Sequence, residues 1–158
     1  MPGGESTTML KLLEEDGLFA PLRAFAAERP VLATCAGVIL LCRQTLSPAQ
    51  RSLGALDAVV ERNAYGRQLD SAIRRLAPEP AAFAELGAEP VEAVFIRAPI
   101  VRETGPAVEV LLRESGRPAL LRQERLLAAT FHPELSADRR IHRLFVESAG
   151  ASGGGAGR

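Results

Sequence analysis

A short run of small residues between two apolar segments constrains this chain most. The pentapeptide Ala33–Gly37 follows the apolar residues 30–32 and precedes the apolar residues 38–41. This pattern predicts a strand that enters a helix through a tight turn, a nucleophile elbow, in which the neighbours of the nucleophile must be small. Cys35 would then stand at the N-terminus of the helix, where the dipole and unpaired N–H groups favour a thiolate. A buried cysteine at a strand end explains the pentapeptide equally well.

The composition indicates one globular domain. The chain has 158 residues, 47% of them hydrophobic, and a formal net charge of zero, which is enough apolar material for a core. Scattered arginines argue against nucleic-acid binding, and no apolar run is long enough to span a bilayer. Two cysteines suit a reducing compartment, so we expect a cytoplasmic protein, with Cys42 as a small core residue in the elbow helix. We expect a single domain over residues 1–148 and a flexible glycine-rich tail over 149–158.

A histidine and a glutamate follow the last apolar strand that the sequence predicts, Leu126–Phe131. Pro133 biases His132 toward an extended conformation, in which residues two apart face the same side. Glu134 can therefore hold the imidazole of His132 in one tautomer. Together with Cys35 these residues supply a nucleophile, a base and an orienting group. A histidine alone is more often structural, and His142, which lies within a helix, is interpreted in that way.

The rest of the chain predicts alternating helices and strands. Ser6 or Thr7 caps a first helix that ends at Gly17, and Ser136 caps the last helix. A second helix covers residues 18–26, strands cover 56–61 and 91–96, and a hairpin joins 108–112 to 119–123. Three prolines between residues 77 and 90 forbid a continuous helix there.

Two segments, one rich in glycine and one polar, are candidate binding loops. The pair Gly3-Gly4 leaves backbone N–H groups open to an anionic ligand, although an ordinary turn is the more common interpretation. The polar segment Arg62–Ser71 follows a strand, where α/β folds keep binding residues, and a solvated surface loop is its alternative. Arg97 likewise places a charge at the end of a strand.

Five blocks in unbroken order carry a resemblance to one family. They are Gly3–Met9, Thr34–Gly37, Glu61–Ser71, Val94–Pro99 and Phe131–Leu135. These blocks closely resemble the glutaminase subunits of pyridoxal 5′-phosphate synthase, the PdxT type of class I glutamine amidotransferase. The resemblance implies an α/β fold of three layers, with a mostly parallel, flavodoxin-like sheet flanked by helices. Here that fold would be N-terminally truncated.

The resemblance also implies a role for each site residue. Cys35 would attack the side-chain amide of L-glutamine and form a thioester, with His132 as the base and Glu134 orienting the imidazole. Backbone N–H groups of Gly4 and Ala36 would hold the oxyanion. The substrate-binding residues would be Gly4, Glu5, Ser6, Arg62, Ile96 and Arg97. The family requires no metal and no cofactor. Ammonia would pass to a (β/α)8-barrel synthase subunit in a hetero-oligomer, and the glutaminase would be weak until that partner docks.

The chain departs from the family in two places. Ala33 stands where the family usually has glycine, and about one βαβ unit that precedes Gly3 in family members is absent. Met1 is therefore expected to be an internal methionine of a longer, active protein, because the catalytic and glutamine-site residues are all present. The alternative is that the short chain is real and is a damaged or partner-dependent remnant. Its function would then be that of a non-catalytic or inactive subunit that only binds the synthase partner. A third hypothesis, another class I cysteine hydrolase, is disfavoured by the segment Arg62–Ser71.

Overall fold

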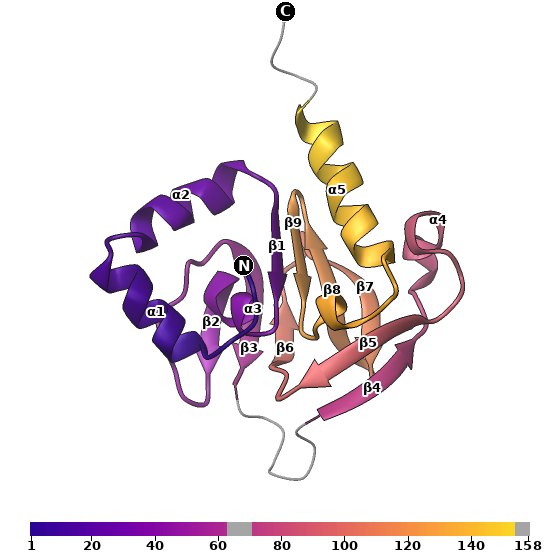
Figure 1. Cartoon of the computed structure of the whole chain (residues 1–158), viewed down its shortest axis with the longest axis horizontal. Coiled ribbons are helices and arrows are strands. Elements are labelled where there is room, and N and C mark those ends of the chain that lie inside the picture. The colour runs from indigo at the N-terminus through magenta and orange to yellow at the C-terminus, as the bar shows by residue number, and fades with distance from the viewer. Residues whose placement is uncertain (63–70, 154–158) are drawn as a thin grey trace, which may run out of the picture.

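The computed structural model describes residues 1–62 and 71–153 (Figure 1). Its α-helices are α1 (Ser6–Glu15), α2 (Phe19–Glu28), α3 (Ala36–Leu41), α4 (Phe83–Leu86) and α5 (Arg140–Gly153), and two 3-10 turns are η1 (Pro80–Ala82) and η2 (Pro133–Leu135). Its strands are β1 (Val31–Thr34), β2 (Cys42–Leu46), β3 (Leu56–Glu61), β4 (Ser71–Leu76), β5 (Val91–Ile96), β6 (Ile100–Thr104), β7 (Glu109–Glu114), β8 (Arg117–Gln123) and β9 (Leu126–Ala129).

The strands form mixed sheets in the orders β1-β9-β8-β7, β2-β3-β6 and β4-β5. The pairs β1·β9 and β2·β3 are parallel, whereas β3·β6, β4·β5, β7·β8 and β8·β9 are antiparallel. The expectation of a mostly parallel sheet is therefore wrong for the described strands. The reason is that short turns join β7 to β8 and β8 to β9, and such turns produce antiparallel pairs.

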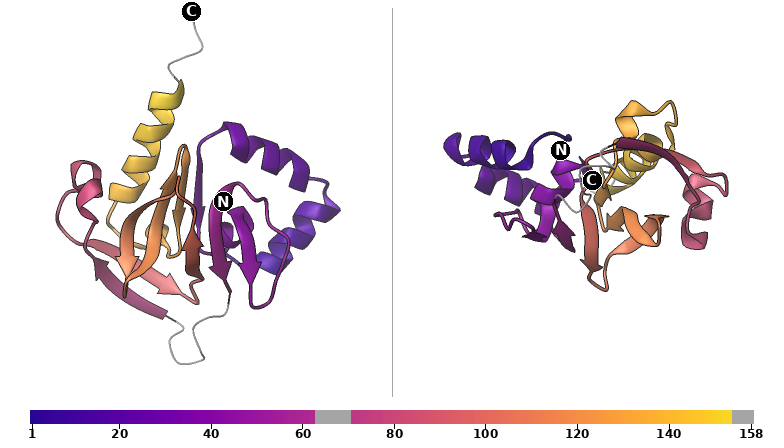
Figure 2. Two further views of the ribbon diagram at one scale, coloured as in Figure 1. Left: turned by 180° about the vertical axis from the view of Figure 1, so that it is seen from behind. Right: turned by 90° about the horizontal axis from the view of Figure 1, so that it is seen from below.

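Helices cover the sheets from two sides. Two views show α1 and α2 on one side of the molecule and α5 with α4 on the other (Figures 1 and 2). Strand β9 faces both layers, because Leu126 and Ala128 belong to one core cluster while Leu127 and Ala129 belong to the other. A strand that is buried on both faces marks the middle of a layered α/β fold. The last predicted strand thus lies at the centre of the molecule, although it ends at Ala129 and not at Phe131, two residues before His132.

Several predicted elements are present with different ends. The first helix is capped by the carboxylate of Glu5, which accepts hydrogen bonds from the backbone N–H groups of Thr7 and Thr8, and not by Ser6 or Thr7. The elbow helix ends at Leu41, so the buried Cys42 begins β2 and lies outside the helix in which it was expected. The predicted strands over 56–61 and 91–96 and the hairpin β7-β8 are confirmed.

The C-terminal helix also differs from its prediction. It begins at Arg140, because the carboxylate of Asp138 caps it by accepting a hydrogen bond from the Arg140 N–H. The hydroxyl of Ser136, which was expected to cap the helix, instead accepts a hydrogen bond from the Asp138 N–H. The helix continues to Gly153, into the segment 149–158 that was expected to be a tail, and 154–158 lie outside the described residues. None of the helices in the described ranges is long and apolar enough to cross a membrane.

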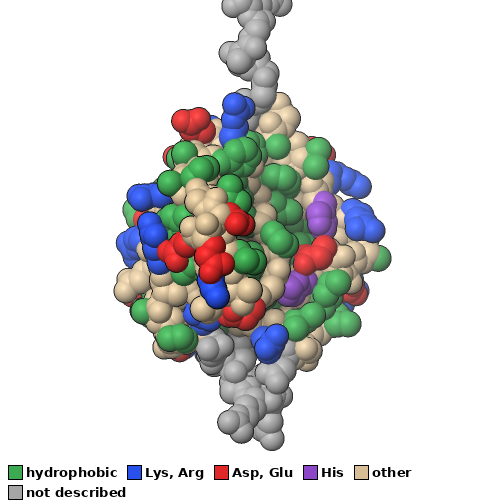
Figure 3. Space-filling view, turned by 60° about the vertical axis from the view of Figure 1, so that its left-hand side comes forward, with side chains coloured by type: hydrophobic (Ala, Val, Ile, Leu, Met, Phe, Trp, Pro, Cys, Tyr) green, Lys and Arg blue, Asp and Glu red, His purple; other side chains and the backbone are tan. Residues whose placement is uncertain are grey.

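Charges are distributed evenly over the visible surface. Acidic, basic and apolar side chains are interspersed on the face drawn in Figure 3, in keeping with the balanced formal charge. A surface without a dominant sign gives little long-range attraction to a polyanion.

Candidate active site

Cys35 lies at the corner between β1 and α3. Its N–H donates to the carbonyl of Ala129 at 2.9 Å, which continues the β1·β9 ladder, and its own carbonyl accepts from the N–H of Val38 at 3.0 Å, which begins the helix. The backbone turns through φ 48° and ψ −108° at this residue. A positive φ at a non-glycine residue costs about 1–3 kcal/mol and is typical of functional corners. The elbow predicted from Ala33–Gly37 is therefore present.

The N-terminal residues Met1–Gly4, which we call the strap, run beside this corner. The N-terminal amine of Met1 donates to the carbonyl of Leu32 at 2.7 Å, and the carbonyl of Met1 accepts from the N–H of Thr34 at 3.0 Å. Gly37 permits this approach, because a Cβ atom there would lie 2.5 Å from the carbonyl oxygen of Met1. The strap thereby carries Gly3 and Gly4 to the reactive end of β1.

His132 enters the site from the end of β9. Its N–H donates to the carbonyl of Val94 at 2.8 Å, which fixes its backbone against β5. Its Nδ1 lies 2.7 Å from Oε1 of Glu134, as predicted, although Glu134 reaches it from the 3-10 turn η2 and not from an extended chain. With Nδ1 facing the carboxylate, Nε2 is left as the imidazole nitrogen for the pocket. Glu134 is the more exposed of the two side chains, at 42% against 13% for His132.

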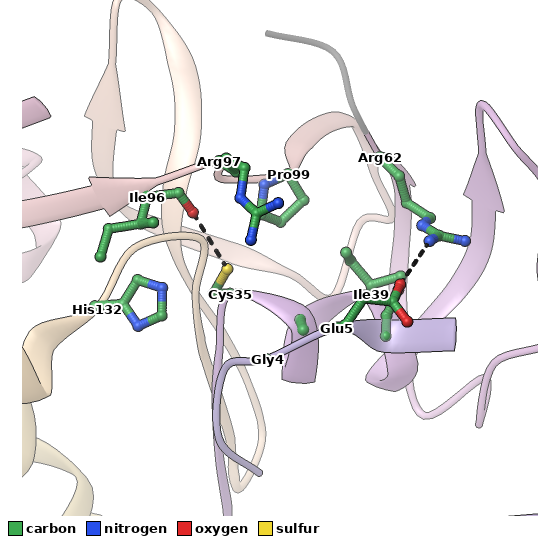
Figure 4. A pocket seen from close by; sticks show the side chains of 11 residues that line it. Gly4, Glu5, Cys35, Ile39, Arg62, Ile96, Arg97, Pro99 and His132 are labelled. Atoms are coloured by element: carbon green, nitrogen blue, oxygen red, sulfur yellow. Dashed lines mark hydrogen bonds and ion pairs between the residues drawn. The ribbon is translucent and has the colours of Figure 1, made fainter. Parts of the chain in front are cut away.

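Gly3 lies close to both the imidazole and the cysteine. A Cβ atom built on Gly3 would lie 2.5 Å from Cε1 of His132 and 3.4 Å from Cβ of Cys35. The first distance is well inside van der Waals contact, so only a glycine fits while the imidazole keeps its place. Figure 4 shows the imidazole and the sulfur at the same end of the pocket.

These residues border a pocket of about 250 Å³. It is lined by Gly4, Glu5, Ser6, Cys35, Ala36, Ile39, Arg62, Ile96, Arg97, Pro99 and His132. Every residue predicted for the site lines this pocket except Glu134, which reaches it through His132. Ile39 and Pro99 were not predicted. Ile39 lies four residues after Cys35, on the same helical face, so periodicity could have indicated it.

The far end of the pocket carries a polar network around Arg62. The Nη1 atom of Arg62 donates to Oε1 of Gln50 at 2.6 Å, and Nη2 donates to Oγ1 of Thr7 at 2.8 Å and to Oε1 of Glu5 at 3.3 Å. The pKa of the Glu5 carboxyl is lowered to about 2, chiefly because it accepts from the N–H and hydroxyl of Thr8. The Glu5 end of this ion pair is thus charged at neutral pH. Gln50 was missed, and residues 63–70 of the predicted binding loop lie outside the described residues.

Burial dominates the electrostatics of the cysteine. Desolvation raises the pKa of the Cys35 thiol, and the charge of Glu134 raises it further. The Ala36 N–H and the Arg97 guanidinium lower it by less. The expectation of a thiolate stabilised by the helix N-terminus is therefore wrong for the resting site. Cys35 is a thiol whose Sγ donates to the carbonyl of Ile96 at 3.8 Å, so it needs a base before it can act as a nucleophile.

This raised pKa predicts slow alkylation of Cys35 in the isolated protein. The thiolate is the reactive form, so the labelling rate with iodoacetamide should be lower than that of glutathione and should continue to rise at pH values where glutathione has levelled off. Mass spectrometry of the peptide that contains Cys35 measures this rate across pH. A labelling rate that levels off at a lower pH than that of glutathione would contradict the prediction.

The described residues hold no cluster of three His, Cys, Asp or Glu side chains that could bind a metal ion. The protein groups at the pocket are a thiol nucleophile, an imidazole oriented by a carboxylate, and an Arg–Glu pair at the opposite end. This combination suits nucleophilic acyl transfer on a small substrate that carries both charges.

Comparison with known proteins gives one consistent result. The model of the SNO glutamine amidotransferase family matches residues 1–150. The pyridoxal 5′-phosphate synthase subunit PdxT of Koribacter versatilis is 52% identical over 147 residues, which cover 93% of this chain and 73% of that protein. The subunit of the same name from Solibacter usitatus is 50% identical over 146 residues, covering 92% and 76%.

Solved structures agree in fold. A crystal structure of a glutamine amidotransferase has a TM-score of 0.83 and 45% identity, and the match covers 94% of this chain and 77% of that one. The crystal structure of a putative GMP synthase protein from Thermoplasma acidophilum has a TM-score of 0.59 at 12% identity, covering 87% and 67%, and shows the fold alone. The α/β amidotransferase-like class predicted from the sequence is confirmed.

Proposed function

The chain belongs to the SNO glutamine amidotransferase family, and from this membership we propose that it acts as the glutaminase subunit of a pyridoxal 5′-phosphate synthase. It hydrolyses L-glutamine to L-glutamate and ammonia, and a synthase partner uses the ammonia to make pyridoxal 5′-phosphate. The observation that carries the proposal is the identity of about half of all residues to subunits of that name, over more than nine tenths of the chain.

The pocket suits glutamine at both of its ends. Arg62 and Glu5 present a cation and an anion at the end away from Cys35 (Figure 4), and these charges complement the α-carboxylate and α-ammonium groups of an amino acid. The side-chain amide of glutamine would then lie beside the sulfur. Gly4, Ser6, Ile96 and Arg97 border the space between the two ends.

The first half of the reaction forms a thioester. Nε2 of His132 takes the proton of the Cys35 thiol, and Sγ attacks the amide carbon to give a tetrahedral oxyanion. The imidazolium, held by Glu134, then gives its proton to the amide nitrogen. The C–N bond breaks, ammonia leaves, and a γ-glutamyl thioester remains on Cys35. Because burial keeps the Cys35 thiol protonated at rest, the thiol loses its proton and attacks only when the substrate is bound.

The second half releases glutamate. A water molecule gives a proton to His132 and attacks the thioester carbon, and the sulfur leaves with that proton as the thiol. In both halves the N–H groups of Ala36 and Gly4 would hold the oxyanion. Ala36 is suited to this because its N–H already lies beside the Cys35 sulfur. Loss of one such donor typically lowers the rate by about two to three orders of magnitude.

The partner is the synthase subunit that consumes the ammonia. We take that protein to be a (β/α)8 barrel in a hetero-oligomer with this chain, and residues 1–148 to be the amidotransferase domain that docks on it. A reactive thiol needs a reducing compartment, which favours the cytoplasm. The glutaminase is expected to be weak before docking and faster after it.

Release of glutamate and ammonia from glutamine tests the proposal. The purified chain, with and without the synthase subunit of the same organism, should hydrolyse glutamine with saturation, and the partner should increase the rate. Asparagine, one methylene shorter, should be a poor substrate because its amide cannot reach Cys35 from the Arg62 end. Binding of the synthase without glutamine hydrolysis would overturn the proposal and would favour the non-catalytic subunit.

A further inference from the structure

Gln50 lies in the segment between β2 and β3 and does not line the pocket, yet it contacts two residues that do. We propose that Gln50 is a positioning residue that holds the Arg62 guanidinium in place for the α-carboxylate of glutamine. The inference rests on the proposed function, because it assigns the substrate group that Arg62 binds.

The carboxamide oxygen of Gln50 accepts two hydrogen bonds. Nη1 of Arg62 donates to it at 2.6 Å, and Oγ of Ser6 donates to it at 3.1 Å. These donors fix which way the carboxamide points, since an amide nitrogen in that position could accept neither bond. The same oxygen therefore ties the end of β3 to the first turn of α1, and both segments border the pocket.

The amide nitrogen of Gln50 is buried, and it has no hydrogen-bond partner among the residues that the structure describes. A buried donor without a partner destabilises the folded state by about 1–3 kcal/mol. An apolar side chain of the same length would avoid that penalty and would fill the same space. A glutamine at this position is thus explained by its acceptor oxygen and not by packing.

Gln50 is an uncharged acceptor, and this matters for binding of the substrate. The Arg62 side chain is 11% exposed, and two of the three partners that its guanidinium has among the described residues, Gln50 and Thr7, are neutral. Glu5 is the one carboxylate that contacts Arg62 among the described residues, at 3.3 Å. Arg62 is thus held in place without being paired to two carboxylates. Its positive charge therefore stays available for an incoming α-carboxylate. Without Gln50, the freed Nη1 would turn toward Glu5, and that charge would be cancelled within the protein.

Kinetics of the complex with the synthase subunit test this role. Gln50→Met keeps the length of the side chain and removes the acceptor, and it should raise the KM for glutamine about tenfold, the effect of one lost hydrogen bond to a charged group. The kcat should change little, because the group lies away from Cys35. Gln44→Met, an exposed site in β2, is the matched control and should change neither constant.

A double mutant separates positioning from a structural role. If Gln50 acts through Arg62, then Gln50→Met should add no further rise in KM to the variant Arg62→Ala. An unchanged KM in Gln50→Met, or an equal rise in both backgrounds, would overturn the inference.

A second variant keeps the test decisive if Gln50→Met folds poorly. Gln50→Glu retains the acceptor, so its melting temperature should stay near that of the wild type, while its negative charge should raise the KM by cancelling that of Arg62. A wild-type KM in Gln50→Glu would overturn the inference. A wild-type complex that releases no ammonia would instead refute the proposed function, and the inference with it.

Discussion

Replacing Cys35 by alanine is expected to reduce glutamine hydrolysis to background. In the proposed mechanism the sulfur forms the thioester, and no other described side chain at that end of the pocket is a nucleophile of comparable strength. Loss of the nucleophile in enzymes of this type lowers kcat on the order of 10⁶-fold. Glutamine binding should persist, because Arg62 and Glu5 remain, and the variant should also keep its fold, because it loses only one sulfur atom.

The measurement is glutamate release by the complex with the synthase subunit. Cys42→Ala is the control, since Cys42 is also buried but lies at the start of β2, where its sulfur contacts Thr45 and backbone carbonyls. That variant should hydrolyse glutamine at close to the wild-type rate. When the reaction of the wild type with glutamine is stopped with acid, a γ-glutamyl group should remain on the peptide that contains Cys35. Substantial hydrolysis by Cys35→Ala would exclude the thioester route.

Replacing Gly3 by alanine is expected to lower kcat about a hundredfold, the cost of moving a catalytic group by about an ångström. The new methyl group would lie 2.5 Å from Cε1 of His132, so the imidazole must move away from its place at the pocket. The KM should change less, because Gly3 does not line the pocket. The strained contact is with a side chain that can rotate, so the variant should still fold.

Steady-state kinetics of glutamine hydrolysis measure this effect. A displaced imidazole loses its contact with Glu134 and its place beside Cys35, so kcat should fall by more than KM changes. Gly150→Ala, in α5 where a Cβ atom meets no neighbour, is the matched control and should leave both constants unchanged. If Gly3→Ala retained the wild-type kcat, His132 could not be the base in the position observed.

Local patterns were sufficient for the corner and for the histidine–glutamate pair. Cys35 sits between an apolar strand and an apolar helix that are adjacent in sequence, so the elbow could be predicted from five residues. The contact between His132 and Glu134 spans two positions and was also predicted correctly, even though η2 replaces the extended chain that the argument assumed. Interactions between sequence neighbours depend little on the rest of the fold.

Features set by distant contacts could not be predicted in this way. Strand β2 is polar at Arg43, Gln44 and Thr45, and it shows no alternation that would indicate a strand; only pairing with β3 makes it one. The role of Gln50 could not be predicted either. Gln50 lies in a loop that contains a proline, and its partners Ser6 and Arg62 belong to other segments of the sequence. The prediction of a thiolate at Cys35 was wrong for the same reason. The helix N-terminus could be seen in the sequence, whereas the burial that outweighs it could not.

The backbone at Cys35 sets two demands on one residue against each other. With φ at 48°, this position is one that glycine occupies more readily than any side chain. A glycine there would relieve the backbone strain, while it would remove the sulfur. The side chain that the proposed reaction needs therefore occupies a corner where the backbone disfavours any side chain.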